Sequence, residues 1–331
     1  MRILVVKLSS LGDVVQTLPV LHDLHARFPG AIVDWVVEEA FADLLRTTPG
    51  IASVIPVAQR RWRKSRFAMA TRAEWRTARE QLRQQPYDAV IDFQGLMKSA
   101  WVARQARLAP GGFSATYGNK SELCSYEWPV RLLLQRMVPM PGRIHAVART
   151  RLLAARALGY DAPGFEQTSP TYPWLLAVPA VPPQVVLAHG TSRADNEWPA
   201  AAWAEFGRAL AADGFALLVP QASDSEERFA RQLAADIGPR ARVLPRMKLA
   251  ALLDAMRGTS GLVGVDSGIA HMAVALNLPV VEIFSQPRAW RAGPVGQPHQ
   301  CAVGGAAAPT VAEVTAAWRA CWGRRPARIP A

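Results

Sequence analysis

The feature that most constrains this chain is an alternation of short apolar, β-branched runs with amphipathic helical patterns. The first half predicts strands at 2–8, 31–37, 53–57 and 88–92, and helices from 14 to near 28–30, at 38–46, 71–85 and 97–107. The second half predicts strands at 184–189, 215–219, 241–244, 261–265 and 279–283, and helices at 199–212, 224–235, 248–257, 268–276 and 309–322. Strands that alternate with helices in this way form parallel sheets covered by helices, so the fold class is α/β.

The alternation occurs twice, on either side of a proline-rich segment. The chain has 331 residues, which suggests two domains. Residues 161–183 contain six prolines and are unsuited to a helix. We predict domains at 1–165 and 184–331, joined by a linker at 166–183. Two α/β halves of this kind suggest an enzyme that binds its ligands in a cleft, at the carboxyl ends of the strands.

Composition narrows the class of protein further. Half of the residues are hydrophobic and 19% are charged, which excludes a disordered chain. The formal charge of +12 indicates an acidic partner: nucleic acid, an anionic membrane or a phosphorylated small molecule. We expect neither a transmembrane helix nor a signal peptide. The three cysteines, 124, 301 and 321, lack metal-like spacing and fit a reducing cytoplasm.

The first candidate site is a predicted turn, Ser9–Asp13, at the end of the first strand. Gly12 permits a tight backbone turn, and Asp13 is positioned to act as a general base if partial burial raises its pKa. A simple helix cap is the competing interpretation of Asp13. No Gly-Lys-Ser/Thr follows, so this is not a Walker-type phosphate loop.

The second candidate site joins an apolar strand to an apolar helix at residues 265–271. Ser267 and Gly268 would lie at the helix N-terminus, where free N–H groups and the helix dipole favour a phosphate. Asp266 and His271 flank that end. An aspartate cap with a buried histidine explains the same residues equally well.

The third candidate site is His189–Arg193, again after a strand. Thr191, Ser192 and Arg193 suit a pyrophosphate, although a plain polar loop is an equal alternative. Glu226, near the end of the next strand, is suited to a ribose diol, although a solvated glutamate in the first turn of a helix is the simpler interpretation.

The fourth candidate site is a basic segment that contains aromatic side chains. Five of the eight residues at 60–67 are basic, Arg60, Arg61, Arg63, Lys64 and Arg66, and two are aromatic. Such a segment can bind phosphate groups, a lipid head-group layer or RNA. Residues 92–99, with Gln94 and Lys98, add polar groups at another strand end. A metal site is not expected, because no Asp-x-Asp occurs and the six histidines form no ligand pair.

In combination these motifs resemble the bacterial lipopolysaccharide heptosyltransferases, over nearly the whole chain. The matching segments are 7–14, 34–39, 55–64, 92–99, 145–149, 189–193 and 265–271. The Arg-Arg-Trp-Arg-Lys run at 60–64 points to the heptosyltransferase I group within that family.

The resemblance implies a GT-B fold, two Rossmann-like domains facing a central cleft. It implies that L-glycero-D-manno-heptose is transferred from ADP-heptose to the Kdo region of lipid A, with inversion and without a metal or cofactor. Asp13 would be the base, with Ser10 and Gly12 beside it. The implied donor residues are Thr191, Ser192, Arg193, Asn196, Glu226, Met247, Asp266, Ser267, Gly268 and His271. The implied acceptor residues are Ser10, Gly12, Arg60, Arg61, Arg63, Lys64, Gln94 and Lys98.

The implied setting is a cytoplasmic monomer on the inner face of the inner membrane, with no nucleic acid partner. Two departures from the family pattern stand out. Asn196 replaces a lysine, and a neutral amide does not offset leaving-group charge as an ammonium does. Gln221-Ala222 replaces Trp-Gly, which changes the shape of the ribose pocket. The alternatives are a heptosyltransferase for an already heptosylated acceptor, a donor-binding protein with impaired turnover because of Asn196, and a nucleic-acid-binding protein.

Overall fold

The computed structural model describes residues 1–331 apart from 66–67, 163, 166–167, 175–181, 192 and 328–331. The chain divides into two compact units, Met1–Pro173 and Trp174–Ala331. The division falls inside the segment that we interpret as a linker. The parts of that segment at 166–167 and 175–181 lie outside the described residues.

The first unit is built on a six-stranded parallel sheet. Its strands are β1 (Arg2–Val6), β2 (Ile32–Glu38), β3 (Ser53–Val57), β4 (Tyr87–Asp92), β5 (Leu108–Tyr117) and β6 (Arg136–Val138). They lie in the order β3-β2-β1-β4-β5-β6. This is the strand order of a Rossmann sheet. The order in which the chain adds strands changes from one side to the other between β1 and β4, which are parallel like the rest.

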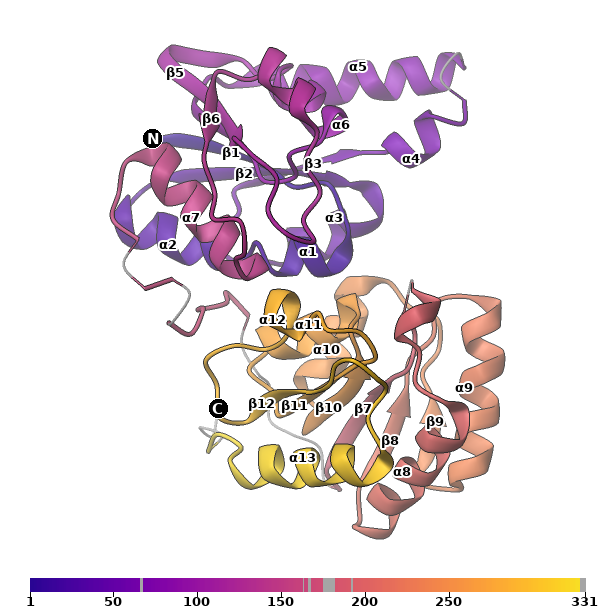
Figure 1. The fold of residues 1–331 in the computed structure, drawn as a ribbon. Helices are drawn as coiled ribbons and strands as arrows, with labels where there is room; N and C mark the ends of the chain where they lie inside the picture. The colour runs from indigo at the N-terminus through magenta and orange to yellow at the C-terminus, as the bar shows by residue number, and fades with distance from the viewer. Residues whose placement is uncertain (66–67, 163, 166–167, 175–181, 192, 328–331) are drawn as a thin grey trace. The chain divides into compact units, whose positions relative to one another are not determined.

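Helices cover both faces of this sheet. They are α1 (Leu11–Val15), α2 (Pro19–Arg27), α3 (Glu39–Arg46), α4 (Gln59–Trp62), α5 (Met69–Gln84), α6 (Met97–Ala103), the 3₁₀ turn η1 (Trp128–Leu132) and α7 (Ala146–Leu158). Figure 1 shows α2, α3 and α7 on one face and α5 and α6 on the other. With both faces covered, the central strands β1, β2 and β4 are almost wholly buried, which is why they appear in the sequence as continuous apolar runs.

The second unit repeats the same design. Its strands are β7 (Gln184–Ala188), β8 (Ala216–Val219), β9 (Ala241–Val243), β10 (Gly261–Val265), β11 (Val280–Phe284) and β12 (Gln300–Gly304), in the order β12-β11-β10-β7-β8-β9. Its helices are η2 (Ala194–Asn196), α8 (Ala200–Ala212), α9 (Asp224–Ile237), α10 (Leu249–Arg257), α11 (Gly268–Ala275), α12 (Ala289–Ala292) and α13 (Val311–Gly323). Figure 1 shows α8, α9 and α13 on one face of this sheet, and α10, α11 and α12 on the other. The order reverses between β7 and β10.

Each unit has its own apolar core. Fully buried aromatic side chains, Trp35 and Tyr87 in the first unit and Trp203 and Trp318 in the second, fill the space between sheet and helices. Each such side chain removes about 150–250 Å² of surface from water. The predicted α/β class is therefore confirmed unit by unit.

One local prediction is wrong. The segment Ser9–Asp13 was expected to be a turn followed by one long helix, but α1 already begins at Leu11, and a second helix starts at Pro19. Ser10 and Asp13 form a capping box that starts α1 early. Proline lacks a backbone N–H and fits the first turn of a helix, so Pro19 marks the start of α2.

The sequence analysis also missed several elements. It assigned nothing to β5, β6, η1, α7, α12 and β12. The strand β5 carries Pro110, Gly111 and Gly112, which are typical of turns, and its register with β4 shifts between Tyr87 and Ala89. Its pairing is fixed by the neighbouring strand, a contact that local propensity does not report.

Helix α7 is attached to α2 by a buried ion pair. The Arg151 guanidinium donates to both carboxylate oxygens of Asp23, at 2.7 and 2.8 Å, and each side chain is only 8% exposed. Arg151 also lies 4.0 Å from the centre of the Phe165 ring. No helix among the described residues is long and apolar enough to cross a membrane.

We expect Arg151→Met to lower the free energy of unfolding by about 3–5 kcal/mol, because it leaves the Asp23 carboxylate buried without its partner. Asp23→Leu combined with Arg151→Met should cost much less, because no charge is then buried. Urea unfolding of the single and double variants measures both. A double variant as unstable as the single one would show that the packing of α7, not the charge balance, dominates.

Candidate functional site

The predicted motifs lie where the strand order of each sheet reverses. Residues 9–13 follow β1 and residues 92–99 follow β4, the two strands at the reversal in the first unit. Residues 189–196 follow β7 and residues 266–271 follow β10, the corresponding strands of the second unit. At such a reversal the loops diverge to opposite faces and leave room for a ligand.

Asp13 is both a helix cap and an accessible acid. Its Oδ2 accepts hydrogen bonds from the backbone N–H of Ser10 at 3.0 Å and from the Ser10 hydroxyl at 2.8 Å. Its Oδ1 lies 3.9 Å from the Lys7 ammonium, and its side chain is 31% exposed. The capping interpretation is therefore confirmed. The role of general base stays a prediction that this position permits.

The loops after β1 and β4 are joined by hydrogen bonds. The Gln94 amide oxygen accepts from the backbone N–H groups of Leu8 and Ser9, both at 3.2 Å. Lys7 donates to the carbonyl of Phe93 at 3.0 Å, and the Lys98 ammonium lies 3.5 Å from the Ser9 hydroxyl. The structure thus brings Ser10, Gly12, Asp13, Gln94 and Lys98 to one edge of the sheet.

Asp92, a buried carboxyl group at the end of β4, holds the residues of this edge by hydrogen bonds. It accepts hydrogen bonds from the Gln94 backbone N–H at 2.9 Å and from the Ser99 hydroxyl at 3.0 Å. Burial raises the pKa of Asp92 to about 6, against the opposing effect of these hydrogen bonds. The sequence motif at 92–99 does not single out Asp92, but in the structure this residue holds the backbone of Gln94.

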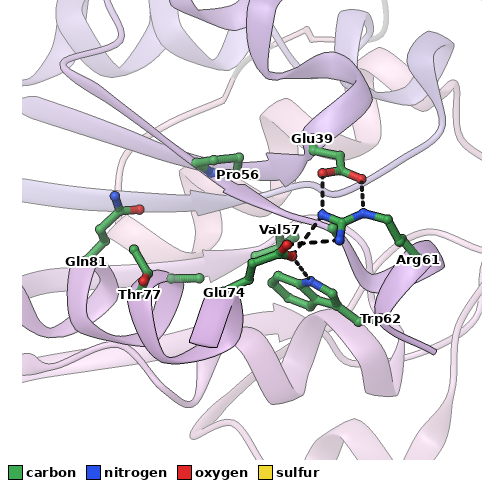
Figure 2. A pocket seen from close by; sticks show the side chains of 10 residues that line it. Glu39, Pro56, Val57, Arg61, Trp62, Glu74, Thr77 and Gln81 are labelled. Carbon is green, nitrogen blue, oxygen red and sulfur yellow. Dashed lines mark hydrogen bonds and ion pairs between the residues drawn. The ribbon is translucent and has the colours of Figure 1, made fainter. Parts of the chain in front are cut away.

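The basic segment begins in α4, and one of its arginines is fully engaged. Figure 2 shows Arg61 between Glu39 of α3 and Glu74 of α5. Its guanidinium donates to both carboxylates at 2.8–3.1 Å, and Trp62 Nε1 donates to Glu74 at 2.6 Å. The hydrogen bonds from Arg61 hold the pKa of Glu74 below its usual value. Arg61 therefore fastens α4 to its neighbours, and it presents less free charge than expected.

Arg60, Arg63 and Lys64 differ from Arg61 in their surroundings. All three are exposed, and none forms an ion pair within 4 Å among the residues that the structure describes. They are therefore the cations of this segment that can meet an acidic ligand. Arg66 lies outside the described residues.

Beside these cations lies an apolar groove of about 590 Å³. Trp62, Trp75 and Trp101 line it, and the Trp75 and Trp101 rings stack at 4.3 Å. Arg63, Arg72 and Lys98 also line the groove. Aromatic rings that are at least partly exposed and lie beside cations are suited to an amphiphilic, anionic partner.

In the second unit the start of α11 forms an anion-binding geometry. Ser267 is the cap of α11, and its hydroxyl accepts from the Ala270 N–H at 3.4 Å. Gly268 is the first helical residue, so the N–H groups of the first turn face outward from the end of β10. His271 lies one turn into the helix and faces Asp266, with Nε2 at 3.3 Å from Oδ1.

The loop after β7 is tied to the end of β10. The Thr191 hydroxyl and the Asn196 side-chain amide both donate to the carbonyl of Asp266, at 3.3 and 3.4 Å. The Asn196 oxygen accepts from the Ser285 N–H at 3.2 Å. Asn196 is 2% exposed. It therefore acts as a structural connector between three strand ends, and a lysine would replace its donor function but not its acceptor function.

Arg193 is exposed and is paired with Asp195 at 2.7 Å. Ser192 lies outside the described residues. Two arginines that the sequence analysis missed lie nearby in and before α12. Arg288 lies 3.7 Å from Asp195, and the charges of Arg291 and Arg288 both act on Asp266. The Pro-Arg-Ala-Trp-Arg run at 287–291, directly after a strand, was the signal that would have found them.

A pocket of about 270 Å³ contains two of the predicted donor residues, Thr191 and Glu226. His189 stacks on Phe229 within it, at 4.6 Å. Burial lowers the pKa of His189, so its ring is neutral near neutral pH. A Cβ at Gly190 would lie 3.2 Å from the Glu226 carboxyl group, so a larger residue there would require that side chain to shift slightly.

Met247 lies half-buried in the loop between β9 and α10. The strands β10, β7, β8 and β9 are adjacent in the sheet, so the loops that carry Asp266, Thr191, Glu226 and Met247 follow one another along its carboxyl edge.

Asp266, His271 and Glu282 bring one nitrogen and two carboxylate oxygens within 4.8 Å of one another, which is the spacing of possible metal ligands. However, His271 Nε2 faces Asp266 and its Nδ1 faces Glu282 at 3.7 Å. A ring that directs each nitrogen to a different carboxylate is typical of a hydrogen-bonded chain, and less of ligands around one ion.

Comparison with known proteins gives a consistent result. The family model described as glycosyltransferase family 9 (heptosyltransferase) matches residues 75–316. Lipopolysaccharide heptosyltransferase 1 of Pseudomonas aeruginosa is 38% identical over 86% of this chain and 78% of its own length. The Escherichia coli K12 protein of the same name is 38% identical over 86% and 88%.

Solved structures agree. Escherichia coli heptosyltransferase WaaC with ADP superposes with a TM-score of 0.82 and 34% identity, over 96% of this chain and 98% of that one. WaaC with ADP-2-deoxy-2-fluoro heptose gives 0.77 and 35%, over 92% and 93%. The predicted class, GT-B with two Rossmann-like domains, is confirmed.

We expect Asn196→Ala to lower the free energy of unfolding by about 1–3 kcal/mol, because the part-buried Ser285 N–H loses its acceptor. Asp195→Ala, one residue away and exposed, should cause no measurable change. Urea unfolding of both variants tests this. Equal effects from the two substitutions would show that Asn196 does not connect the strand ends.

Proposed function

Because the chain belongs to glycosyltransferase family 9, the heptosyltransferases, we propose that it transfers L-glycero-D-manno-heptose from ADP-heptose to a Kdo residue of a Kdo-bearing lipid A precursor, with inversion. Membership of the family confirms the resemblance inferred from the motifs. It makes the chain a heptosyltransferase of lipopolysaccharide core synthesis.

The observation that carries the proposal is the placement of the two halves of the chemistry at the two strand-order reversals. One reversal presents Asp13, an accessible carboxylate beside Lys7. The other presents the N-terminus of α11 with arginines around it. A base for an acceptor hydroxyl and an anion site for a leaving diphosphate are the two requirements of an inverting transfer.

The proposed reaction is a single displacement. Asp13 takes the proton of the acceptor hydroxyl as its oxygen forms a bond to the anomeric carbon of the heptose. The bond from that carbon to the diphosphate oxygen breaks, and ADP departs with the electron pair. Attack opposite the leaving group inverts the anomeric centre.

No metal is required in this scheme. The N–H groups at the start of α11, together with Arg193, Arg288 and Arg291, are suited to offset the charge of departing ADP. Thr191 and Glu226, which line one pocket, are suited to the phosphate and ribose. Asn196 then serves the architecture of this site, so the charge that a lysine would supply comes from the arginines.

The acceptor side is strongly cationic. Arg60, Arg63, Lys64 and Lys98 are suited to the carboxylates and phosphates of the acceptor. The tryptophan groove beside them is suited to contact the lipid layer in which the acceptor lies. We therefore propose a peripheral location on the cytoplasmic face of the inner membrane.

The test is release of ADP from ADP-heptose, with and without Kdo-bearing lipid A that lacks heptose. Release that depends on the acceptor supports the proposal, and the configuration of the product tests inversion. Donor binding without release would favour a disabled donor-binding protein. Release only with a heptosylated acceptor would favour the related heptosyltransferase, and absence of donor binding would contradict both.

We expect Asp13→Asn to reduce kcat by roughly 10²–10⁴-fold, because the amide cannot accept the proton. Asparagine can still accept the hydrogen bond from the Ser10 N–H, so the cap of α1 and the thermal stability should be preserved. ADP release and thermal unfolding measure the two properties. Activity within a few-fold of wild type would rule out Asp13 as the base.

Arg63→Ala and Lys64→Ala should each raise the KM for the acceptor by about tenfold, with kcat little changed, and added salt should shrink the difference. Arg83→Ala, an exposed arginine near the end of α5, is the control. Steady-state kinetics at low and high salt measure these effects. Equal KM values for all three variants would contradict the assignment of the acceptor site to α4 and the residues that follow it.

A further inference from the structure

A buried glutamate behind the donor site has no role in the scheme above. Glu282 lies in β11, opposite Gly264 of β10, and is 0% exposed. Neither of its carboxylate oxygens has a hydrogen-bond partner among the described residues. His271 faces it, with Nδ1 at 3.7 Å from Oε1. Burying an acid without donors is costly, so a glutamate here, where an apolar residue would pack, calls for a functional reason.

Glu282, His271 and Asp266 form a chain that leads from the interior to the ligand edge. Glu282 is buried in the sheet, the His271 side chain is 8% exposed, and the Asp266 side chain is 21% exposed. Burial raises the pKa of Glu282 to about 8, only partly offset by the charge of His271. Burial also acts to raise the pKa of Asp266, but the hydrogen bond and charge of His271 and the charges of Arg291 and Arg288 outweigh it, and the pKa is lowered.

We propose that Glu282 is a positioning residue that keeps a proton on Nε2 of His271, so that His271 holds the Asp266 carboxylate in place for the sugar of the bound donor. This inference rests on the proposed function for the identity of the ligand. The arrangement of protons can be tested without it.

Proton counting explains how Glu282 acts. With a proton on its carboxyl group, Glu282 donates toward Nδ1, and the one ring proton of His271 sits on Nε2. If that proton moves to Nδ1, His271 is doubly protonated and Nε2 still carries its proton. In either distribution an N–H faces Asp266.

Removal of this shared proton reverses the arrangement. Ionised Glu282 then attracts the single remaining ring proton to Nδ1. The lone pair of Nε2 faces the Asp266 carboxylate, and the two repel each other. Activity that depends on Asp266 should therefore be present below a pH of about 8 and fall as the pH rises through that value.

Other charged and titratable groups lie near Glu282, His271 and Asp266. Arg288 and Arg291, from the α12 region, act on Asp266 by charge. Cys321 of α13 donates to the Val280 carbonyl. Cys301 of β12 is paired in the sheet with Val281, the residue before Glu282. Because successive side chains of a strand point to opposite faces, the Val281 and Glu282 side chains lie on opposite faces of the sheet.

Two substitutions separate the hypotheses. Glu282→Gln keeps the shape and can donate its amide N–H to Nδ1, but it does not titrate. Glu282→Leu keeps the approximate volume and cannot donate. Glu205→Gln, an exposed glutamate of α8, is the matched control. Urea unfolding confirms that each variant is folded before kinetics are measured.

We expect Glu282→Gln to retain kcat/KM for ADP-heptose within about threefold and to lose the decline above a pH of about 8 that wild type and Glu205→Gln share. Glu282→Leu should lower kcat/KM by at least about tenfold at all pH values. Nitrogen NMR of His271 in the ligand-free protein, assigned with His271→Gln, should show Nε2 protonated in wild type and Glu282→Gln, but not uniformly in Glu282→Leu.

Three outcomes would overturn the inference: a Glu282→Leu variant with wild-type kinetics, an unchanged alkaline decline in Glu282→Gln, or the same ring protonation in all variants. Loss of activity with a chelator, restored by a divalent cation, would also overturn it, because a metal would occupy the same atoms. An inactive wild type would instead contradict the proposed function, while the NMR result would still decide the role of Glu282.

Discussion

The structure depends on the reversal of strand order at the centre of each parallel sheet. Because right-handed crossovers carry the chain to opposite faces on the two sides of the reversal, the loops after β1 and β4, and after β7 and β10, diverge at the carboxyl edge. Hydrogen bonds then join each pair of loops. Gln94 holds the loop after β1, and Thr191 and Asn196 both donate to the carbonyl at the end of β10. Each of these loop pairs is therefore tied to the carboxyl edge of its sheet.

Ion pairs between side chains, and not composition alone, decide which cations near these edges are available to a ligand. The net charge of +12 does not reveal which cations are available to a ligand. Arg61 is held by two glutamates and Arg193 by Asp195, whereas Arg60, Arg63 and Lys64 form no ion pair in the described part of the chain. In the second unit, Arg288 and Arg291 add positive charge near Asp266. An ion pair between side chains far apart in sequence changes the role of an arginine without any change in its local motif.

Two buried polar residues of the second unit, Asn196 and Glu282, have different roles. Asn196 uses both ends of its amide to connect strand ends, which accounts for a neutral side chain at this buried position. Glu282 lies in the adjacent strand without hydrogen-bond donors, with only His271 within ion-pair distance among the described residues. Because burial makes the charged form of such a group costly, its protonation state determines which nitrogen of His271 carries a proton, and His271 in turn faces Asp266.

The sequence by itself determined the α/β class, the two-unit division, and most strands and helices, because buried parallel strands leave continuous apolar runs and helices leave a regular period. It also predicted correctly that Ser9–Asp13 comes after the first strand and that 266–271 comes directly after a strand of the second unit, since both follow apolar runs. It did not reveal β5, whose Pro110 and glycines are overridden by pairing with β4, nor the separate start of α1 at Leu11. Only the tertiary structure decided that Arg61 is engaged, that Asn196 is a connector and that Glu282 faces His271. Those properties arise from contacts between residues 11 to 89 positions apart, and no local pattern in the chain encodes them.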